Sequence, residues 1–355
     1  MSRAFESIQV GPWQLPQRFV MAPLTRNRAG EGQAPGPLNA EYYGQRASAG
    51  LIISEGTQPS AVGQGYLDTP GIHSPEQVEG WRAVADAVHA GGGRIVIQMM
   101  HAGRIAHPDN KNGLESVAPS AIAAPGQIVT ATGQQDHVLP RALETDEIAG
   151  VVAEFVHAAR QAVAAGIDGV EVHAANGYLV HQFLAPSSNT RTDGYGGSPQ
   201  ARARFAVEVT TAVAEAIGAE RVGIRISPSH NIQGVLEEDP ADVAATYEAL
   251  VEQIAPLGLA YLSILGDPSS DLLLDLRKRF GGPVIANSGF GKITSLTDVE
   301  EILEAGHGDL VAVGREFLAN PDLARRWREG LPLNTPNDKT FYGGGAEGYT
   351  DYPFA

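Results

Sequence analysis

The sequence predicts a single (β/α)8 barrel, and three observations lead to this fold class. Short apolar segments bounded by turn residues recur along the chain, helical patterns lie between them, and polar residues follow several of them. The apolar segments are continuous rather than alternating, as expected for parallel strands that are covered on both faces. They comprise residues 18–21, 51–54, 94–99, 169–172, 221–226, 260–265, 283–286 and 310–313. A doubly wound sheet is the alternative, but eight repeated units and dispersed polar positions favour the barrel.

The helices between these segments have recognisable start and stop signals. A capping side chain followed by proline opens three of them, at Ser74-Pro75, Ser198-Pro199 and Asp239-Pro240. Thr145 is expected to open a longer helix, and Gly166 is expected to close it in the C-cap region. Strand and helix therefore alternate without a linker, which predicts one domain over residues 1–355.

Two connections are longer than ordinary barrel loops. Residues 102–144, after the third segment, are rich in proline, glycine and alanine. Loops beyond about 15 residues are usually functional or disordered, so we expect a capping loop over the substrate. Residues 331–355 carry many glycines and aromatics. This C-terminal tail is expected to lie over the barrel; a frayed end is the alternative.

Composition narrows the possible partners. The 355 residues include 43% hydrophobic residues, carry a formal net charge of −16 and contain no cysteine. Without a basic run, nucleic acid and anionic membranes are unexpected partners. Without cysteine, disulfides, thiolate metal sites, iron–sulfur clusters and a cysteine nucleophile are excluded. No signal peptide and no run of ~18 apolar residues is present, so we expect a cytoplasmic protein, monomeric or weakly homo-oligomeric.

The most informative stretch is residues 169–184, an apolar strand followed by His173, Asn176 and Tyr178. Active sites of barrels lie at the carboxyl ends of the strands. Polar residues also end other segments, including Thr25, Gln98 and Arg225. The alternative for each is a structural role, such as pairing of Arg225 with Glu171, because a buried arginine needs an anion.

The last two strands end in Ser288-Gly289 and Gly314-Arg315. Barrels often bind a phosphate group at this place through backbone N–H groups and a short extra helix. The pattern therefore predicts a phosphate-bearing ligand. The alternative is that these glycines form ordinary turns and that Arg315 pairs with a carboxylate.

Several motifs occur together and in order along nearly the whole chain. They are A-P-L-T-R, Q-M-M-H-A-G-R, H-A-A-N-G-Y-L-V-H-Q-F-L, S-N-T-R-T-D-G-Y-G-G-S and V-G-R. Together they resemble the old yellow enzyme family, FMN-dependent ene-reductases with a TIM-barrel fold. The resemblance implies tightly but non-covalently bound FMN, NADPH or NADH as reductant, and activated alkenes as substrates. Enones, maleimides, nitroalkenes and nitrate esters are the implied substrate classes.

The resemblance also implies roles for individual residues. His173 and Asn176 would bind the substrate oxygen, and Tyr178 would supply a proton after hydride transfer in a ping-pong cycle. Tyr66, Met100 and Tyr342 would line the substrate pocket. The residues expected to contact FMN are Pro23, Thr25, Gly56, Gln98, Arg225, Ser288, Gly289, Gly314 and Arg315.

Met100 departs from the family, since many related members have tryptophan there; the smaller side chain is expected to widen the pocket. The branch of dienoyl-CoA reductases is excluded, because it needs a cysteine-ligated cluster and further domains.

Other functions agree less well with the sequence. The spacing of His101, His107, His173 and His181 fits no zinc pattern. An FMN-dependent hydroxyacid oxidase would need a base that takes a proton from the substrate, whereas His173, Asn176 and Tyr178 are expected to donate. A barrel lyase or aldolase would want a strand lysine, and none of the four lysines lies in a predicted strand. A non-catalytic flavoprotein would leave Tyr178 unexplained.

Overall fold

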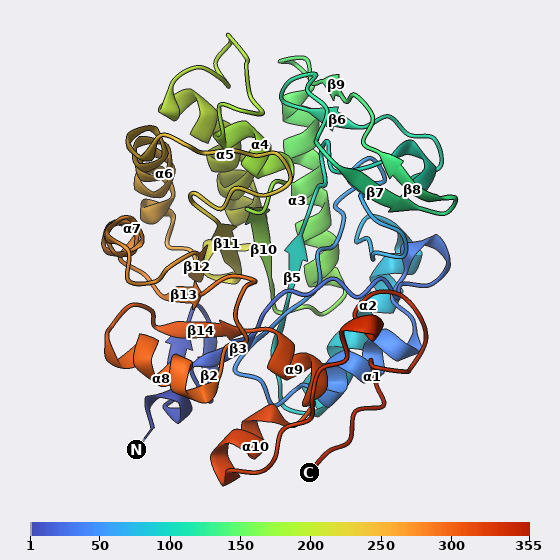
Figure 1. Cartoon of the computed structure of the whole chain (residues 1–355), viewed down its shortest axis with the longest axis vertical. Coiled ribbons are helices and arrows are strands. Elements are labelled where there is room, and N and C mark those ends of the chain that lie inside the picture. Colours follow the sequence, from blue (N-terminus) through green and yellow to red (C-terminus); the bar gives the residue numbers. More distant parts are fainter. Residues whose placement is uncertain (1) are drawn as a thin grey trace.

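The computed structural model describes residues 2–355 and contains a closed barrel of eight parallel strands (Figure 1). In chain order the barrel strands are β3 (Phe19–Met21), β4 (Ile52–Ile53), β5 (Ile95–Met99), β10 (Gly169–Ala174), β11 (Val222–Ile226), β12 (Tyr261–Leu265), β13 (Val284–Asn287) and β14 (Leu310–Val313). Each overlaps one of the eight predicted segments, and β13 ends one residue beyond its segment; the predicted (β/α)8 fold is confirmed. Strand β10 is longer than predicted and includes His173.

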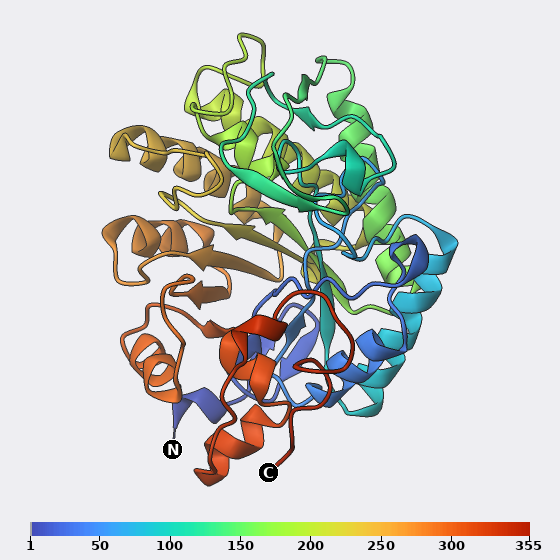
Figure 2. The ribbon, with the colours of Figure 1, turned by 45° about the vertical axis from the view of Figure 1, so that its right-hand side comes forward.

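Helices surround the barrel (Figure 2). The longer ones are α1 (Pro37–Gln45), α2 (Pro75–Ala90), α3 (Ile148–Ala164), α5 (Pro199–Ile217), α6 (Pro240–Ile254), α7 (Asp271–Phe280) and α8 (Leu296–Glu304). Short helices α4 (Leu179–Leu184), α9 (Arg315–Ala319) and α10 (Leu323–Glu329) follow the strand ends or precede the tail. Single 3₁₀ turns are η1 (Arg3–Phe5), η2 (Glu31–Gln33), η3 (Pro108–Asn110), η4 (Ala219–Arg221), η5 (Ala255–Leu257) and η6 (Asp338–Thr340). Among residues 2–355, no helix combines the length and apolar character needed to cross a membrane.

Most of the predicted helix ends are confirmed. Ser74, Ser198 and Asp239 each accept a hydrogen bond from a backbone N–H of the first helical turn. Gly166 has φ +86° and follows the last turn of α3. The predicted start at Thr145 was wrong, because α3 begins at Ile148. The Thr145 hydroxyl instead donates to Asp193, 2.5 Å away, a carboxylate that Arg191 holds in place.

The amino end of the barrel is closed by a hairpin that was not predicted. Strands β1 (Ile8–Val10) and β2 (Trp13–Leu15) pair antiparallel just before β3. Their buried side chains pack with residues from inside the barrel in one apolar cluster, which includes Val10, Trp13, Leu15, Val20, Ile53, Val96, Tyr261 and Ile285. This cluster fills the barrel interior below the carboxyl end.

The long insertion after β5 has secondary structure of its own. It contains β6 (Val117–Ala118), β7 (Gln127–Thr130), β8 (Gly133–Asp136) and β9 (Arg141–Ala142). Strands β7 and β8 form an antiparallel hairpin, and β6 pairs with β9. Residues 102–144 are therefore an ordered insertion beside the carboxyl end of the barrel (Figure 1).

The C-terminal tail is tied to the body through buried arginines. Arg26 donates hydrogen bonds to the carbonyls of Phe341 and Gly348, and Arg46 donates to Leu318. Tyr349 is fully buried and stacks on Tyr42 with ring centroids 4.1 Å apart. Residues near the end of the chain thus pack against the first barrel segments.

Candidate functional site

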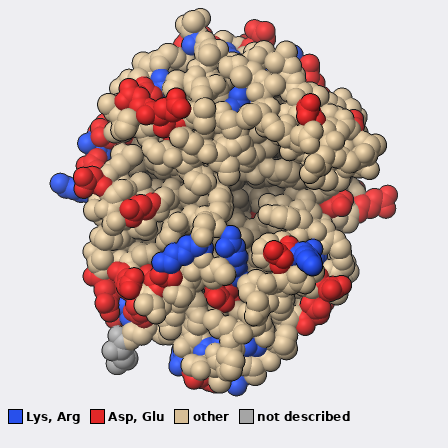
Figure 3. Space-filling view, viewed as in Figure 1, with Lys and Arg blue, Asp and Glu red and all other residues tan. Residues whose placement is uncertain are grey.

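A cavity of about 380 Å³ lies at the carboxyl ends of the barrel strands. Eleven of the predicted site residues line it: Pro23, Thr25, Gly56, Gln98, Met100, His173, Asn176, Tyr178, Arg225, Arg315 and Tyr342. They come from six barrel strands or the segments that follow them, namely β3, β4, β5, β10, β11 and β14, and from the tail. The space-filling view is hollowed near its centre, with mostly uncharged residues around the hollow and Lys or Arg at its lower border (Figure 3).

The turn after β10 has a backbone shape that few residues adopt. Asn176 has φ +58° and Gly177 has φ +86°, both in the left-handed region. A Cβ on Gly177 would lie 2.8 Å from the Cβ of Gln233 and 3.0 Å from the Ile232 carbonyl oxygen. Only glycine fits this approach, which brings the loop after β11 onto the turn.

A buried side chain beneath the turn fixes it. The Gly177 N–H donates to Nδ1 of His181 at 2.9 Å, and Nε2 of His181 lies 3.2 Å from Oε1 of Glu237. Tyr247 donates to the same carboxylate oxygen at 2.9 Å. His181 is fully buried.

His173 and Asn176 have polar atoms without a hydrogen-bond partner among residues 2–355. His173 is 3% exposed and Asn176 is 8% exposed, and neither Nδ1 of His173 nor Oδ1 of Asn176 has a hydrogen-bond partner. Burial, with the positive charge of Arg225, holds the pKa of His173 well below its usual range. The imidazole is therefore neutral at physiological pH and has one N–H to donate.

Tyr178 is also buried, and its hydroxyl belongs to a small network. It lies 3.0 Å from the hydroxyl of Tyr66, which in turn lies 3.4 Å from Oε1 of Gln233. Nε2 of Gln233 donates to the Asn176 carbonyl oxygen at 2.7 Å. Burial raises the pKa of Tyr178, so the phenol keeps its proton at neutral pH. Gln233 was missed, because it lies in an irregular loop without a motif.

A second cavity of about 620 Å³ adjoins the first and shares Thr25, Tyr178, Gln233 and Tyr342 with it. Its other walls include Tyr66 and the inner side of the insertion, with Ile105, Pro125, Ile128, Val129 and His137. Tyr342 stands at the mouth and is 70% exposed. The insertion therefore encloses space next to the His173–Tyr178 turn.

Met100 lines the main cavity. It is 2% exposed and packs in one cluster with Tyr66, Ile105 and Tyr178. Its sulfur lies 2.5 Å from where a Cβ on Gly56 would stand, so glycine at position 56 leaves room for it. The position that distinguishes this chain thus touches both the Gly56 backbone and the tyrosines.

Arg225 lines the same cavity as Tyr178 and is buried without an ion pair to another described residue. It is 2% exposed, and its Nε and Nη1 have no hydrogen-bond partner in the described chain. Glu171 lies near enough for its charge to oppose the lowering of the Arg225 pKa by burial, yet Oε2 of Glu171 and Nε and Nη1 of Arg225 have no partner among residues 2–355. Pairing with Glu171, the structural alternative, is therefore not what occupies these nitrogens. Free buried donors of this kind fit an electron-rich or anionic ligand.

The predicted phosphate residues are only partly brought together. Arg315 lines the main cavity and donates to the Phe290 carbonyl oxygen at 2.5 Å. Gly289, with φ +91°, uses its N–H in a 2.9 Å bond to Oδ1 of Asn287. Ser288 faces a separate outer pocket beside Lys292, and Gly314 precedes α9 without lining the main cavity.

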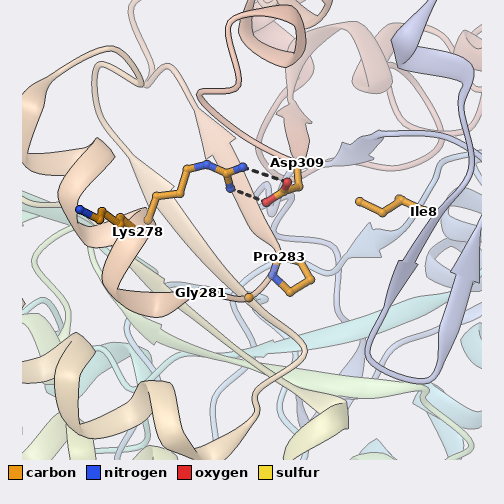
Figure 4. Close-up of a pocket in the computed structure, with 7 residues that line it drawn as sticks. Ile8, Lys278, Gly281, Pro283 and Asp309 are labelled. Atoms are coloured by element: carbon orange, nitrogen blue, oxygen red, sulfur yellow. Dashed lines mark hydrogen bonds and ion pairs between the residues drawn. The ribbon is translucent and has the colours of Figure 1, made fainter.

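A pocket at the amino end of the barrel has a different character (Figure 4). It has a volume of about 450 Å³ and is lined by Ile8, Arg277, Lys278, Gly281, Gly282, Pro283 and Asp309. Arg277 and Asp309 are paired there, with Nη2 and Oδ1 3.0 Å apart. None of the predicted site residues lies in this pocket, and its main charges already satisfy each other.

The barrel and its main cavity together define a class of protein. The cavity is lined by the unpaired donors of Arg225, by the amide of Gln98, by the neutral polar side chains of His173 and Asn176, and by the phenol of Tyr178. This arrangement is that of a flavin-binding oxidoreductase, since a flavin presents a polar, electron-accepting edge.

Comparison with known families agrees with this class. The model of the NADH:flavin oxidoreductase / NADH oxidase family matches residues 3–334. The chain belongs to this family, the old yellow enzyme family of flavin-dependent oxidoreductases.

Relatives with assigned names extend over the whole chain. A probable flavin mononucleotide-dependent alkene reductase of Leishmania infantum is 42% identical, with 100% of both chains covered. The chanoclavine-I aldehyde reductase fgaOx3 of Penicillium roqueforti is 41% identical over 100% of this chain and 97% of its own. The 12-oxophytodienoate reductase 1 of Oryza sativa is 40% identical over 98% and 91%.

Solved structures share the fold closely. Morphinone reductase in complex with tetrahydroNAD has a TM-score of 0.93 and 45% identity, covering 99% of this chain and 97% of its own. The old yellow enzyme homologue from Zymomonas mobilis has a TM-score of 0.93 and 39% identity, covering 99% of each chain.

Proposed function

We propose that the protein is an FMN-dependent ene-reductase that uses NADPH or NADH to reduce activated alkenes. Enones, maleimides and nitroalkenes are the main substrate classes, and nitrate esters are a further one. One observation carries the proposal: His173, Asn176 and Tyr178 have unused or protonated polar groups in the same cavity as the unpaired Arg225. One shared cavity also suits a ping-pong cycle, in which the nicotinamide leaves before the alkene binds.

The residues around the cavity fit FMN. Bound FMN supplies hydride transfer, which no amino-acid side chain performs. Thr25, Gln98 and Arg225 would hold its polar edge, and Arg315 would hold the phosphate at the ends of β13 and β14, together with Ser288, Gly289 and Gly314 nearby. Pro23 and Gly56 line the same wall. The unsatisfied Nε and Nη1 of Arg225 support this assignment, because a buried cation without a partner is costly. With no cysteine in the chain, a cysteinyl link to the flavin is excluded and non-covalent binding is proposed.

Substrate binding falls to His173 and Asn176. A neutral imidazole offers one N–H and a carboxamide offers two, and both can point at one carbonyl or nitro oxygen. Negative charge grows on that oxygen as hydride reaches the β-carbon, and preorganised donors in a site of low dielectric stabilise it strongly. The turn that holds both residues is fixed by His181 and Gly177, so the donors need little reorganisation.

Tyr178 is the proposed proton donor. Its phenol is buried, protonated, and held by the Tyr66 hydroxyl 3.0 Å away. The proton goes to the α-carbon as the enolate collapses, and Tyr66 and Gln233 keep the hydroxyl from turning away. The capping insertion, residues 102–144, encloses the neighbouring cavity and would receive the rest of the alkene.

The substitution Tyr178→Phe tests this function. Positioned proton transfer contributes about 10²–10⁴-fold to a rate, so reduction of 2-cyclohexenone should slow by roughly that range. Reduction of the flavin by NADPH or NADH should stay unchanged, since that step needs no proton from Tyr178. Anaerobic stopped-flow measurement of the two half-reactions separates these outcomes.

Unchanged turnover of 2-cyclohexenone in Tyr178→Phe would remove Tyr178 from the mechanism. The variants His173→Ala and Asn176→Ala give a parallel check without turnover: they should bind p-hydroxybenzaldehyde more weakly, as the flavin spectral shift reports. A purified protein without FMN would contradict the proposal as a whole.

A further inference from the structure

A carboxylate inside the barrel has no role in the function proposed so far. Glu171 lies on β10, two residues before His173, and is fully buried. Residues two apart on a strand face the same side, so both side chains point into the barrel. A buried carboxylate is costly unless hydrogen bonds and an opposite charge compensate for it.

Gln98 supplies the hydrogen bond. It stands directly across from Glu171 in the pairing of β5 with β10, and its Nε2 donates to Oε1 of Glu171 at 2.7 Å. Because the amide nitrogen is used in this way, Oε1 of Gln98 is left to accept a hydrogen bond in the cavity above. Glu171 thus decides which end of the Gln98 amide faces the flavin position.

Arg225 supplies the opposite charge. Each group favours the charged form of the other: Arg225 opposes the rise of the Glu171 pKa on burial, and Glu171 opposes the fall of the Arg225 pKa. Within the described part of the chain, Oε2 of Glu171 has no hydrogen-bond partner, and neither do Nε and Nη1 of Arg225. The two charges therefore balance through space, which leaves the guanidinium donors free for a ligand.

The neighbouring strand β11 has no side chain opposite Glu171. Position 223, which pairs with Glu171, is glycine, and a Cβ there would lie 2.3 Å from the ring of Tyr261. The ring of Tyr261 crosses this space, and burial, together with the negative charge of Glu171, raises the pKa of its phenol. Glu171 and Tyr261 are both fully buried, so solvent does not reach either side chain.

We propose that Glu171 is a positioning and tuning residue of the flavin site, the counter-charge of Arg225 and the anchor of the Gln98 amide. This inference rests on the proposed FMN-dependent function. Reduced flavin carries more negative charge than oxidised flavin, and Arg225 favours the reduced form. A fixed carboxylate behind Arg225 weakens that preference and so lowers the reduction potential.

The variant Glu171→Gln removes the charge but keeps an oxygen that can accept from Gln98. We expect the equilibrium between oxidised and reduced flavin to move at least tenfold toward reduction, about 30 mV upward for a two-electron couple. The midpoint potential is measured by anaerobic dye titration of the FMN-loaded protein. Thermal unfolding of the apoprotein shows that the variant still folds.

The variant Glu171→Asp separates the two roles, because it keeps the charge and shortens the reach to Gln98. We expect a potential near that of the wild type and an FMN dissociation constant at least tenfold higher, measured by fluorescence titration of apoprotein. Glu154→Gln is the matched control. Glu154 is a half-buried carboxylate whose pKa is also raised by burial, but it lies on the outer helix α3, so its removal should leave the potential unchanged.

A wild-type potential in Glu171→Gln would overturn the inference, and so would an upward shift of equal size in Glu171→Asp or in Glu154→Gln. Where Glu171→Gln does not fold, Glu171→Asp alone decides: an upward shift of about 30 mV or more in this variant, which keeps the charge, would overturn the inference. Failure of the wild-type protein to bind FMN would contradict the proposed function instead, so the two failures are distinguishable.

Discussion

Burial sets the protonation states of the two catalytic candidates in opposite directions. The pKa of His173 falls because burial and Arg225 disfavour the imidazolium, and the pKa of Tyr178 rises because burial disfavours the phenolate. The usual values are about 6.5 and about 10. Both groups therefore keep their neutral form over a wider pH range than free side chains would.

A flat pH profile follows for the reduction of the alkene. His173 is already neutral below its ordinary pKa, and Tyr178 remains protonated up to at least its ordinary pKa. We expect the rate of flavin oxidation by 2-cyclohexenone to be constant between about pH 6 and pH 9, measured with pre-reduced enzyme by stopped flow. A fall in rate with an inflection near pH 6.5 would show a protonated His173 and contradict the assignment.

The residues of the site differ in how far the sequence could predict their positions. His173, Asn176 and Tyr178 lie within six residues of one strand end, so local sequence carries the whole turn. Gln233 comes from a loop more than fifty residues later and meets Tyr66 and Asn176 only through the closed barrel. Gly289 was expected to offer its N–H, but the Asn287 side chain already accepts it.

At the scale of elements, the tail shows how distant parts of the chain support the cavity. The Gly343 N–H donates to the Arg26 carbonyl oxygen at 2.9 Å, directly after Thr25. Arg26 and Arg28 lie over the ring of Tyr349, 5.0 and 4.5 Å from its centroid. Tyr342, at the cavity mouth, is therefore held between the Arg26 contact and the buried Tyr349.

The substitution Tyr349→Ala should destabilise this element strongly. It removes a fully buried ring that stacks on Tyr42, and loss of a buried aromatic side chain costs about 3–5 kcal/mol of the free energy of unfolding. Urea denaturation measures the change. Tyr349→Phe is the control: it loses only the bond from Asn39 at 3.1 Å, which corresponds to roughly 1 kcal/mol. Equal losses in both variants would show that the ring packing contributes little.

Elements with regular periodicity were predictable, and irregular ones were not. The barrel strands are continuous apolar runs, and the helix caps are local side-chain contacts, so both follow from sequence. The β7–β8 hairpin turns through Ala131 and Thr132 without the Asn-Gly or Asp-Gly pair that usually marks such turns. Thr145 resembles a helix cap, but its hydroxyl binds Asp193 from a segment that only the folded chain brings near.

At the scale of the whole molecule, the two ends of the barrel have separate tasks. The carboxyl end holds the cavity with the unpaired polar atoms, whereas the amino end is closed by the β1–β2 hairpin and its apolar cluster. In barrels of this type, the residues that carry chemistry lie at the carboxyl end of the strands, and the residues at the amino end serve stability. Substitutions at the amino end should therefore change stability without changing catalysis.

The substitution Trp13→Ala tests this separation. Trp13 is 6% exposed, and its ring lies against Gly169, where a Cβ would be only 2.9 Å from Cη2. Removing the ring leaves a cavity at the foot of β10, so the free energy of unfolding in urea should fall by about 3–5 kcal/mol. The kcat/KM for 2-cyclohexenone below the unfolding range should stay at the wild-type value, since β10 still presents His173 from its other end. Tyr178→Phe should give the opposite pattern, with lost turnover and retained stability. A loss of kcat/KM in folded Trp13→Ala would mean that packing at the amino end is transmitted along β10 to the His173–Tyr178 turn.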